Sequence, residues 1–222
     1  MIRLFVFDLD GTLVDSLRDL ADSANELLVS YGAAPLEMAT IGGMVGDGAA
    51  RLVARACAAV GIAPSDALVR FLEIYDARLL AHTRPYEGIP DVIATLGRRA
   101  SLAVLTNKPL GATRRILAGL DLARFFDDDA VIGGDGPWPR KPDTAGLRHL
   151  CAMAAVAPAE AMLVGDSHVD WRTASDAGTA ICLARYGFGF AGFPSGALQG
   201  GEHFIDAPAE LLHLRSPDGR PI

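Results

Sequence analysis

Short apolar runs alternate with segments of helical periodicity along most of the chain, and this alternation constrains the fold more than any other feature. Strands that are buried on both faces are apolar throughout, and parallel strands are joined by helices. The sequence therefore predicts an α/β fold, a Rossmann-like parallel sheet between two layers of helices. The predicted strands are 3–7, 101–106, 130–133, 161–164 and 179–183, with a weaker one at 203–205. The predicted helices are 91–98, 112–120, 144–154, 169–177 and 209–213, with Pro90 and Pro142 marking helix starts.

Residues 16–84 interrupt this alternation, because they hold three helical patterns and no strand-like run. Apolar residues recur at helical spacing over 17–31, 52–60 and 68–79. An insertion directly after the first strand would lie above the carboxyl ends of the strands, where open α/β sheets bind ligands. We therefore expect a core formed by residues 1–15 and 85–222, and an α-helical cap formed by residues 16–84 that acts as a lid.

The composition excludes several classes of function. The 222 residues carry a net charge of −7, whereas a nucleic-acid-binding domain needs a basic face. No apolar run approaches the roughly 18 residues of a membrane-spanning helix, and the first residues do not resemble a signal peptide. Cys57, Cys151 and Cys182 lie in apolar contexts without metal-type spacing, which is typical of buried, reduced thiols. We expect a cytoplasmic protein, monomeric or homodimeric, with no nucleic-acid or membrane partner.

Two aspartates follow the first predicted strand directly, in the segment Asp8-Leu9-Asp10-Gly11. Residues i and i+2 of an extended chain project to the same side, so both carboxylates point toward one place. Like charges this close repel each other unless a cation or a shared proton relieves them. A costly pair of this kind indicates a metal-dependent enzyme rather than a structural protein.

Further polar segments stand at the ends of later predicted strands. They are Thr106-Asn107-Lys108, Lys141-Pro142-Asp143 and Gly165-Asp166-Ser167-His168-Val169-Asp170. The aspartates of the segment 8–11 and those of the segment 165–170 offer hard oxygen ligands of the kind that Mg²⁺ prefers. A threonine hydroxyl and a lysine ammonium suit a phosphoryl group, and a carboxylate can attack phosphorus to form an aspartyl-phosphate. The set predicts Mg²⁺-dependent phosphoryl transfer.

In their order and spacing these segments resemble the four motifs of the haloacid dehalogenase superfamily, and the resemblance covers essentially the whole chain. The first motif, Asp-x-Asp-Gly-Thr-(Leu/Val)-x-Asp-Ser, is matched throughout by residues 8–16. The second ends a strand in Thr or Ser, here Thr106, and the third is a lysine, here Lys141. The fourth, Gly-Asp-Ser-x-x-Asp, is matched by residues 165–170. Within the superfamily the chain looks most similar to phosphoglycolate phosphatase-like enzymes with an α-helical cap.

The resemblance implies a role for each motif residue. Asp8 would be the nucleophile, while Asp10 would protonate the leaving alcohol and then activate the water that hydrolyses the intermediate. Thr106 and Lys141 would hold the phosphoryl oxygens. The expected cofactor is Mg²⁺, bound by Asp8, by Asp166 and by the backbone carbonyl of Asp10. Asp170 would orient metal-bound water, and the expected substrate is a small phosphorylated metabolite.

Other residues are candidates for binding the phosphate or the rest of the substrate. Gly11 and Thr12 belong to the first motif, and we expect Asn107 to bond the phosphoryl group or the nucleophile. In the cap, the turn that contains Gly46 and Asp47 is a candidate for contact with the substrate when the lid closes. Arg51 could reach a substrate anion from one face of a cap helix, although a solvated surface position is the simpler expectation.

Hydrolysis of a small phosphomonoester is the leading hypothesis, and alternatives stay open. A sugar-phosphate phosphomutase similar to β-phosphoglucomutase would return the phosphoryl group to a sugar, and related phosphatases take pyrophosphate or nucleotides. A non-catalytic binding protein on the same scaffold is disfavoured, because all four motifs are intact. Dehalogenation is also disfavoured, because the dehalogenases of the superfamily lack the second aspartate that Asp10 provides. Phosphonate cleavage would need a cap lysine, and residues 16–84 contain none.

Overall fold

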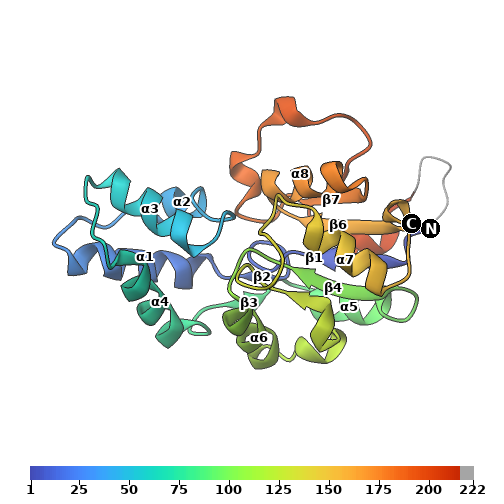
Figure 1. Cartoon of the computed structure of the whole chain (residues 1–222), viewed down its shortest axis with the longest axis horizontal. Helices are drawn as coiled ribbons and strands as arrows, with labels where there is room; N and C mark the ends of the chain where they lie inside the picture. The colour runs from blue at the N-terminus through green and yellow to red at the C-terminus, as the bar shows by residue number, and fades with distance from the viewer. Residues whose placement is uncertain (216–222) are drawn as a thin grey trace.

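The computed structural model describes residues 1–215, and its centre is a 6-stranded parallel sheet (Figure 1). The strand order is β5-β4-β1-β6-β7-β8. The chain runs outward from β1 to one edge, returns to the centre at β6 and runs outward to the other edge. The strands are β1 (Leu4–Phe7), β4 (Ser101–Leu105), β5 (Val131–Ile132), β6 (Ala161–Gly165), β7 (Ala180–Ala184) and β8 (His203–Ile205).

Alternate side chains of β1 enter two separate cores. Phe5 and Phe7 pack among residues of α5 and α6, whereas Leu4 and Val6 pack among residues of α7 and α8. Successive residues of a strand face opposite ways, so a strand that is apolar throughout has to be covered on both sides. The covering helices are α5 (Ile89–Leu96), α6 (Leu110–Gly119), α7 (Ala145–Met153) and α8 (His168–Ala177). The predicted three-layer α/β/α fold is confirmed.

Some local elements differ from those predicted. Residues 209–213 belong to a 3-10 helix, Pro208–His213, rather than an α-helix. Pro142 does not begin a helix, because α7 starts at Ala145, with Thr144 as its N-cap. A proline is tolerated in a loop as well as in a first turn, so it does not fix a helix start by itself. Further 3-10 segments are Ala123–Phe125, Asp128–Ala130, Pro158–Glu160, Phe190–Gly192 and Ser195–Ala197.

The helices of residues 16–84 form a separate lobe beside the sheet (Figure 1). They are α1 (Leu17–Ser30), α2 (Met38–Gly42), α3 (Ala49–Ala59) and α4 (Ala67–Arg78). Leu27 and Leu28 of α1 and Phe71 of α4 are fully buried, and they belong to the same apolar cluster as Phe5 and Phe7 of the sheet. The short α2 was not predicted, because its 5 residues are too few to show a helical period. No helix within residues 1–215 is both long and apolar enough to span a bilayer.

A short antiparallel ribbon joins the lobe to the sheet. Its strands, β2 (Val14–Asp15) and β3 (Arg84–Pro85), carry the chain into the lobe and back out of it. Strands of 2 residues carry no periodic signal, and the ribbon was therefore not predicted. Next to it, Asp19 of α1 is fully buried and accepts hydrogen bonds from the N–H groups of His82 and Thr83. The two chain crossings are thus tied to each other.

Candidate active site

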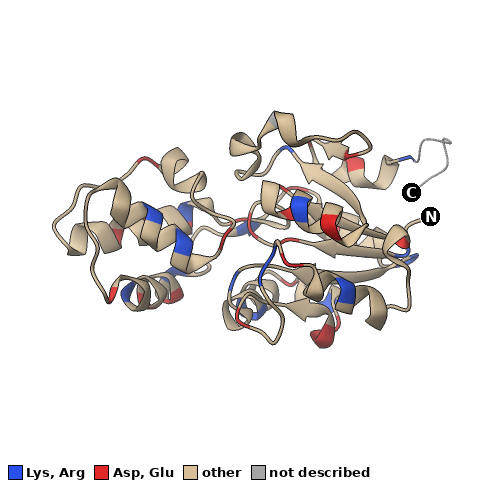
Figure 2. Cartoon of the chain, turned by 45° about the horizontal axis from the view of Figure 1, so that its top comes forward, with Lys and Arg blue, Asp and Glu red and all other residues tan. Residues whose placement is uncertain are grey.

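Three neighbouring strands bring the sequence motifs together at their carboxyl ends. β4 and β6 flank β1, and Phe7 is in register with Val104 and Val164. Residues directly after these strands therefore share one edge of the sheet, at the place where the strand order reverses. Figure 2 shows acidic and basic ribbon segments gathered between this edge and the lobe of α1–α4. Ligands bind at such a position in open α/β sheets.

Lys141 is the buried cation on the nucleophile side of this edge. Its Nζ lies 3.0 Å from Asp8 Oδ1 and 2.5 Å from Asp170 Oδ1. Burial alone would lower the pKa of Lys141, but the Asp170 and Asp8 carboxylates raise it above its usual value. The ammonium therefore stays charged and offsets part of the repulsion among the buried aspartates.

Asp8 is a poorly solvated carboxylate. Burial raises the pKa of Asp8 to about 6, against the opposing effect of Lys141. The N–H of Leu9 donates to Asp8 Oδ1 at 2.7 Å and helps to fix the side chain. A carboxylate that has lost most of its water and is held in one orientation is well placed to act as a nucleophile.

Asp8, Asp166 and Asp170 form a buried acidic cluster, with candidate ligand atoms that lie within 4.8 Å of one another. Burial raises the pKa of Asp166 well above its usual value, and the Asp170 and Asp8 carboxylates add to this. Gly11 faces this carboxyl with φ +83, and a Cβ there would lie 1.9 Å from Asp166 Oδ2, so only glycine leaves room. Crowded carboxylates with too little compensating charge fit a hard divalent cation such as Mg²⁺.

Asp170 is already engaged on both sides. Its Oδ1 accepts from Lys141, and its Oδ2 accepts from the Ser167 hydroxyl at 2.6 Å. Ser167 is the N-cap of α8 and also receives the N–H of Asp170. This capping box holds Asp170 in place. Because both of its carboxylate oxygens already accept hydrogen bonds, Asp170 is less available as a metal ligand than Asp8 or Asp166.

Asp10 has an environment quite different from that of Asp8. Ser16 Oγ donates to Asp10 Oδ1 at 2.5 Å, and Lys108 Nζ lies 3.1 Å and 3.0 Å from the two carboxylate oxygens. The same Nζ donates to the Tyr75 hydroxyl at 2.7 Å. Burial raises the pKa of Tyr75 to about 12 in spite of the nearby Lys108. Burial alone would lower the pKa of Lys108, but Asp10 raises it above its usual value.

Thr106, Asn107 and Thr12 complete the polar surroundings. Thr106 Oγ1 accepts from the N–H of Lys108 at 3.2 Å. Asn107 Nδ2 donates to the carbonyls of Lys141 and Gly46, at 3.0 Å and 2.9 Å, and so joins two loops rather than reaching Asp8. Within residues 1–215, Thr12 Oγ1 and Asn107 Oδ1 are buried without a hydrogen-bond partner. Such atoms are rare in folded proteins, and an unpartnered hydroxyl suits an anionic ligand.

A cavity of about 550 Å³ lies between the lobe and the core, beside Asp10. Lys108 and Arg140 line it from the core side. Its lobe side is mainly apolar and is formed by Leu20, Val45, Ala49, Leu52, Phe71, Leu72 and Tyr75. The cavity can therefore hold the part of a small ligand that extends away from the acidic cluster.

Of the cap residues predicted to contact the substrate, one lines this cavity and two do not. Gly46 lines it together with Gly48. Asp47 does not, and its carboxylate forms an ion pair with Arg55. Arg51 is exposed and also lies outside the cavity lining, in agreement with the simpler expectation for it.

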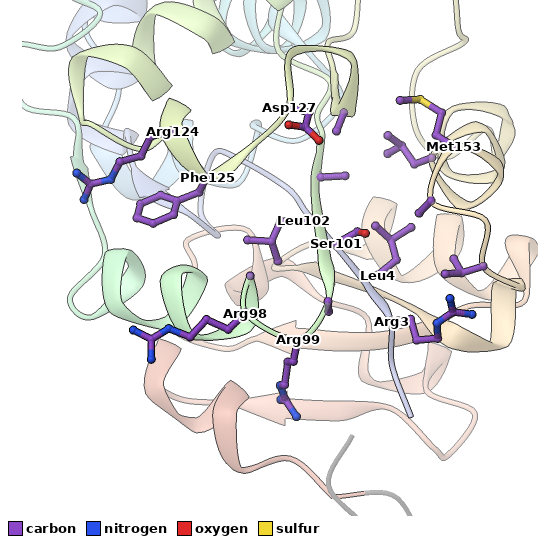
Figure 3. Close-up of a pocket in the computed structure, with 17 residues that line it drawn as sticks. Arg3, Leu4, Arg98, Arg99, Ser101, Leu102, Arg124, Phe125, Asp127 and Met153 are labelled. Carbon is purple, nitrogen blue, oxygen red and sulfur yellow. The ribbon is translucent and has the colours of Figure 1, made fainter.

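A second cavity, of about 630 Å³, lies at the opposite edge of the sheet (Figure 3). Segments that precede β1, β4 and β6 line it, and they contribute Arg3, Arg98 and Arg99. Figure 3 shows that their guanidinium groups point in different directions rather than toward one place. Arg3 is also paired with Glu160. Because this cavity has no convergent polar groups, the cavity beside Asp10 is the candidate site.

Lys108, Tyr75 and Ser16 were not predicted as site residues. Lys108 could have been found, because it stands two residues after Thr106 at a strand end, in the same relation as Asp10 to Asp8. Tyr75 lies within the helical pattern predicted over 68–79, and Ser16 was matched as the last residue of the first motif, without a role of its own. Ser16 is the N-cap of α1 but makes no capping hydrogen bond there. No local pattern reports a contact between residues that are distant along the chain.

Comparisons with known proteins agree with this geometry. Residues 5–184 match the family model described as haloacid dehalogenase-like hydrolase. A phosphoglycolate phosphatase of Rhodospirillum rubrum is 42% identical over 198 residues, which are 85% of this chain and 81% of the relative. A plasmid phosphoglycolate phosphatase of Cupriavidus necator is 34% identical over 217 residues, or 96% of this chain and 92% of the relative. The crystal structure of a predicted phosphoglycolate phosphatase from Haemophilus somnus superposes with a TM-score of 0.87 at 28% identity, covering 96% of this chain and 97% of that one.

Proposed function

The chain belongs to the haloacid dehalogenase-like hydrolases and is a phosphoric monoester hydrolase, and we propose that it uses Mg²⁺ and an aspartyl-phosphate to hydrolyse a small, phosphoglycolate-like ester. The observation that carries this proposal is the buried Asp8 carboxylate, paired with Lys141 and crowded by Asp166 and Asp170. The names of the relatives support the substrate class.

In this proposal Asp8 attacks phosphorus. The new Asp8–phosphorus bond forms while the ester P–O bond breaks, which splits one difficult displacement into two easier steps. The Lys141 ammonium, 3.0 Å from Asp8, offsets the negative charge of the phosphoryl oxygens. The hydroxyls of Thr106 and Thr12 supply hydrogen bonds to the same oxygens, and the Thr12 hydroxyl has no other partner in residues 1–215.

Asp8, Asp166 and the Asp10 carbonyl would hold the Mg²⁺ ion, with Asp170 supporting its water ligands. When bound, the ion would offset negative charge on the phosphoryl group. The cluster fits this role, because it brings three carboxylates together and, within residues 1–215, Lys141 is the one buried ammonium that contacts them.

Asp10 moves the protons. It gives a proton to the oxygen of the leaving alcohol, and its carboxylate then takes a proton from the water that attacks the aspartyl-phosphate. The two aspartates have different partners, which suits two roles. Asp8 lies among acidic groups and Lys141, whereas Asp10 lies beside Ser16 and Lys108.

We keep the division into a core of residues 1–15 and 85–222 and a cap of residues 16–84. In this division the ribbon β2–β3 is the hinge, because it contains both crossings of the chain. The expected partner is a small phosphorylated metabolite that enters when the cap moves, with no nucleic acid or membrane. The buried cysteines in residues 1–215 support the cytoplasm as the location, and a monomer or homodimer is expected.

Phosphate release from phosphoglycolate and other small esters, with Mg²⁺ and with EDTA, tests the proposal. We expect turnover that EDTA abolishes and that Asp8→Asn reduces by about a thousandfold or more. Rapid quenching of the wild-type reaction should trap phosphate on Asp8. Full activity of Asp8→Asn, or turnover that is indifferent to EDTA, would overturn the mechanism. Phosphoryl return to a sugar hydroxyl without phosphate release would identify a mutase instead.

A further inference from the structure

The chain contains two lysines, Lys108 and Lys141, and both are buried at the candidate site. No arginine among residues 1–215 is buried. Lysine carries a compact ammonium with three N–H donors, whereas arginine carries a wide planar group. Lys141 serves the phosphoryl site in the proposed function. Lys108 has no role there, although it is equally buried.

The three donors of Lys108 match three acceptors. Its Nζ lies 3.1 Å and 3.0 Å from the oxygens of Asp10 and 2.7 Å from the Tyr75 hydroxyl. The side chain is 4% exposed, so water does not compete strongly for these contacts. Lys108 therefore connects Asp10 to one residue of the lobe.

Tyr75 provides this connection from α4. Its ring stacks on Phe71 with centroids 5.8 Å apart, and the Lys108 ammonium lies 4.5 Å above the same ring. Tyr75 is therefore fixed to the lobe by its ring and reaches the core through its hydroxyl. If the lobe moved away from the core, Lys108 would lose both the hydroxyl and the ring, and its hold on Asp10 would loosen.

We propose that Tyr75 and Lys108 are positioning residues that place the Asp10 carboxyl for proton transfer only when the cap is seated on the core. This inference rests on the proposed function, because it takes Asp10 as the proton donor and acceptor. Ser16, which begins the lobe, donates to Oδ1 of the same carboxylate at 2.5 Å. Both supports of Asp10 thus depend on the position of the cap.

The consequence appears in the first chemical step. As the Asp8–phosphorus bond forms, the ester P–O bond breaks, and its electron pair stays on the leaving oxygen. An alkoxide needs the proton of Asp10 at that moment, whereas a carboxylate or a nitrophenolate is stable without one. Misplacement of Asp10 should therefore slow the release of alcohols and spare the release of stabilised anions.

The test compares three substrates by kcat/KM, which reports the steps up to the first irreversible one. Acetyl phosphate releases acetate and needs no proton, ethyl phosphate releases an uncharged alcohol, and phosphoglycolate releases an alcohol with a carboxylate. For Tyr75→Phe we expect a loss of about tenfold on both alkyl esters, the effect of one hydrogen bond, and a change within about twofold on acetyl phosphate. For Lys108→Met we expect a loss of about a hundredfold or more on the alkyl esters. Lys108→Arg, which keeps the charge, should retain more alkyl activity than Lys108→Met.

Tyr31→Phe is the matched control, because it removes another lobe hydroxyl that bonds Asp66 at 2.6 Å, away from the cavity. It should leave all three kcat/KM values unchanged. If Tyr75→Phe lowered kcat/KM equally on all three substrates, the role of Tyr75 would be merely structural and the inference would be overturned. A loss confined to phosphoglycolate would make Lys108 a binder of the substrate carboxylate, and would also overturn it.

A spectroscopic readout tests the contact without turnover. Lysine labelled with ¹³C at Cε should give two side-chain signals, one for each lysine, and Lys108→Arg assigns them. Tyr75→Phe should shift the Lys108 signal and leave the Lys141 signal in place. An unmoved Lys108 signal would contradict the link between Tyr75 and Lys108. A wild-type enzyme that releases no phosphate from any ester would instead contradict the proposed function, and the spectra would still decide whether the link exists.

Discussion

Asp8 and Asp10 stand only two residues apart in the chain, yet their neighbours give them different chemical environments. Asp8 lies in a buried acidic cluster and is 3.0 Å from Lys141. Asp10 lines the cavity between the lobe and the core and is paired with Lys108. Each carboxylate has its own buried ammonium, and this pairing makes two acidic groups at such a spacing tolerable.

Lys141→Met tests the first of these pairs through stability. We expect the free energy of unfolding of the metal-free protein to fall by about 3 kcal/mol near pH 7.5, because Asp8 and Asp170 lose a buried partner. The loss should shrink toward about pH 5, since Asp8, with its pKa already raised to about 6, becomes neutral there. Urea unfolding in EDTA at both pH values measures the difference. Arg3→Met, which breaks an exposed ion pair, should cost less than about 1 kcal/mol, and an equal loss for Lys141→Met at both pH values would speak against this account.

Protons should compete with Mg²⁺ at the acidic cluster. Burial raises the pKa of Asp8 to about 6 and that of Asp166 well above its usual value, so the metal-free protein loses stability as pH rises through this range. Metal binding needs both carboxylates without protons. The increase in melting temperature caused by Mg²⁺ should therefore be largest near neutral pH and fade toward about pH 5. Asp166→Asn should abolish the increase, and an increase independent of pH would exclude this linkage.

Asp19 shows how a single helix residue fixes the return of the chain from the lobe. It lies in the first turn of α1, where a negative charge is favoured by the helix dipole. The N–H groups of His82 and Thr83 and the Thr83 hydroxyl all donate to it, at 2.9 Å, 2.7 Å and 2.7 Å. The segment before β3 is thus held to the start of α1 by one buried carboxylate.

Asp19→Ala should cost about 2–3 kcal/mol of unfolding free energy, because buried N–H groups are left without an acceptor. The effect should also be local, with faster hydrogen exchange at residues 82–86 than in the sheet strands. The control is Asp22→Ala on the same helix, whose carboxylate is 3.7 Å from Arg18, and it should cost less than about 1 kcal/mol. Similar costs for the two variants would show that the bonds to residues 82 and 83 contribute little.

The elements that the sequence predicted correctly are those with a strong local pattern. β1, β4, β6 and β7 are continuous apolar runs, and α1, α3 and α4 carry apolar residues at helical spacing. The ribbon β2–β3 has no such pattern, because its pairing joins Val14 to Pro85 across the whole lobe. Elements that exist only through tertiary contacts leave no periodic trace in the chain.

The same distinction between local pattern and tertiary contact applies to the residues of the candidate site. The sequence places Asp8, Thr106 and Asp166 at one edge of the sheet, because the carboxyl ends of parallel strands share it, but it does not by itself give the strand order that makes them neighbours. The contacts of Lys108 with Tyr75 could not be predicted, because they depend on how the lobe is oriented on the core. Residues that join two parts of a molecule are hidden from any argument that treats each segment alone.

On the scale of the whole molecule, few polar contacts among residues 1–215 hold the lobe against the core. Besides Lys108 with Tyr75, Asn107 donates to the Gly46 carbonyl at 2.9 Å, and Arg115 of α6 pairs with Asp76 of α4. The last pair is exposed and therefore adds little stability. Because the cavity lies between the two parts, a ligand that bridges them should strengthen the contact between them.

Vanadate, an analogue of the transferred phosphoryl group, should therefore close the lobe onto the core and reduce motion at the ribbon. We expect slower cleavage by a nonspecific protease, and slower hydrogen exchange, near residues 14–17 and 83–88 when vanadate and Mg²⁺ are present. The segment 195–201, which lies outside the ribbon and the cavity beside Asp10, serves as an internal control and should be cleaved as before. Asp8→Asn with Lys141→Met should show no protection, because the groups proposed to hold the analogue are gone. Unchanged cleavage at the ribbon of the wild-type protein would mean that the lobe does not act as a lid.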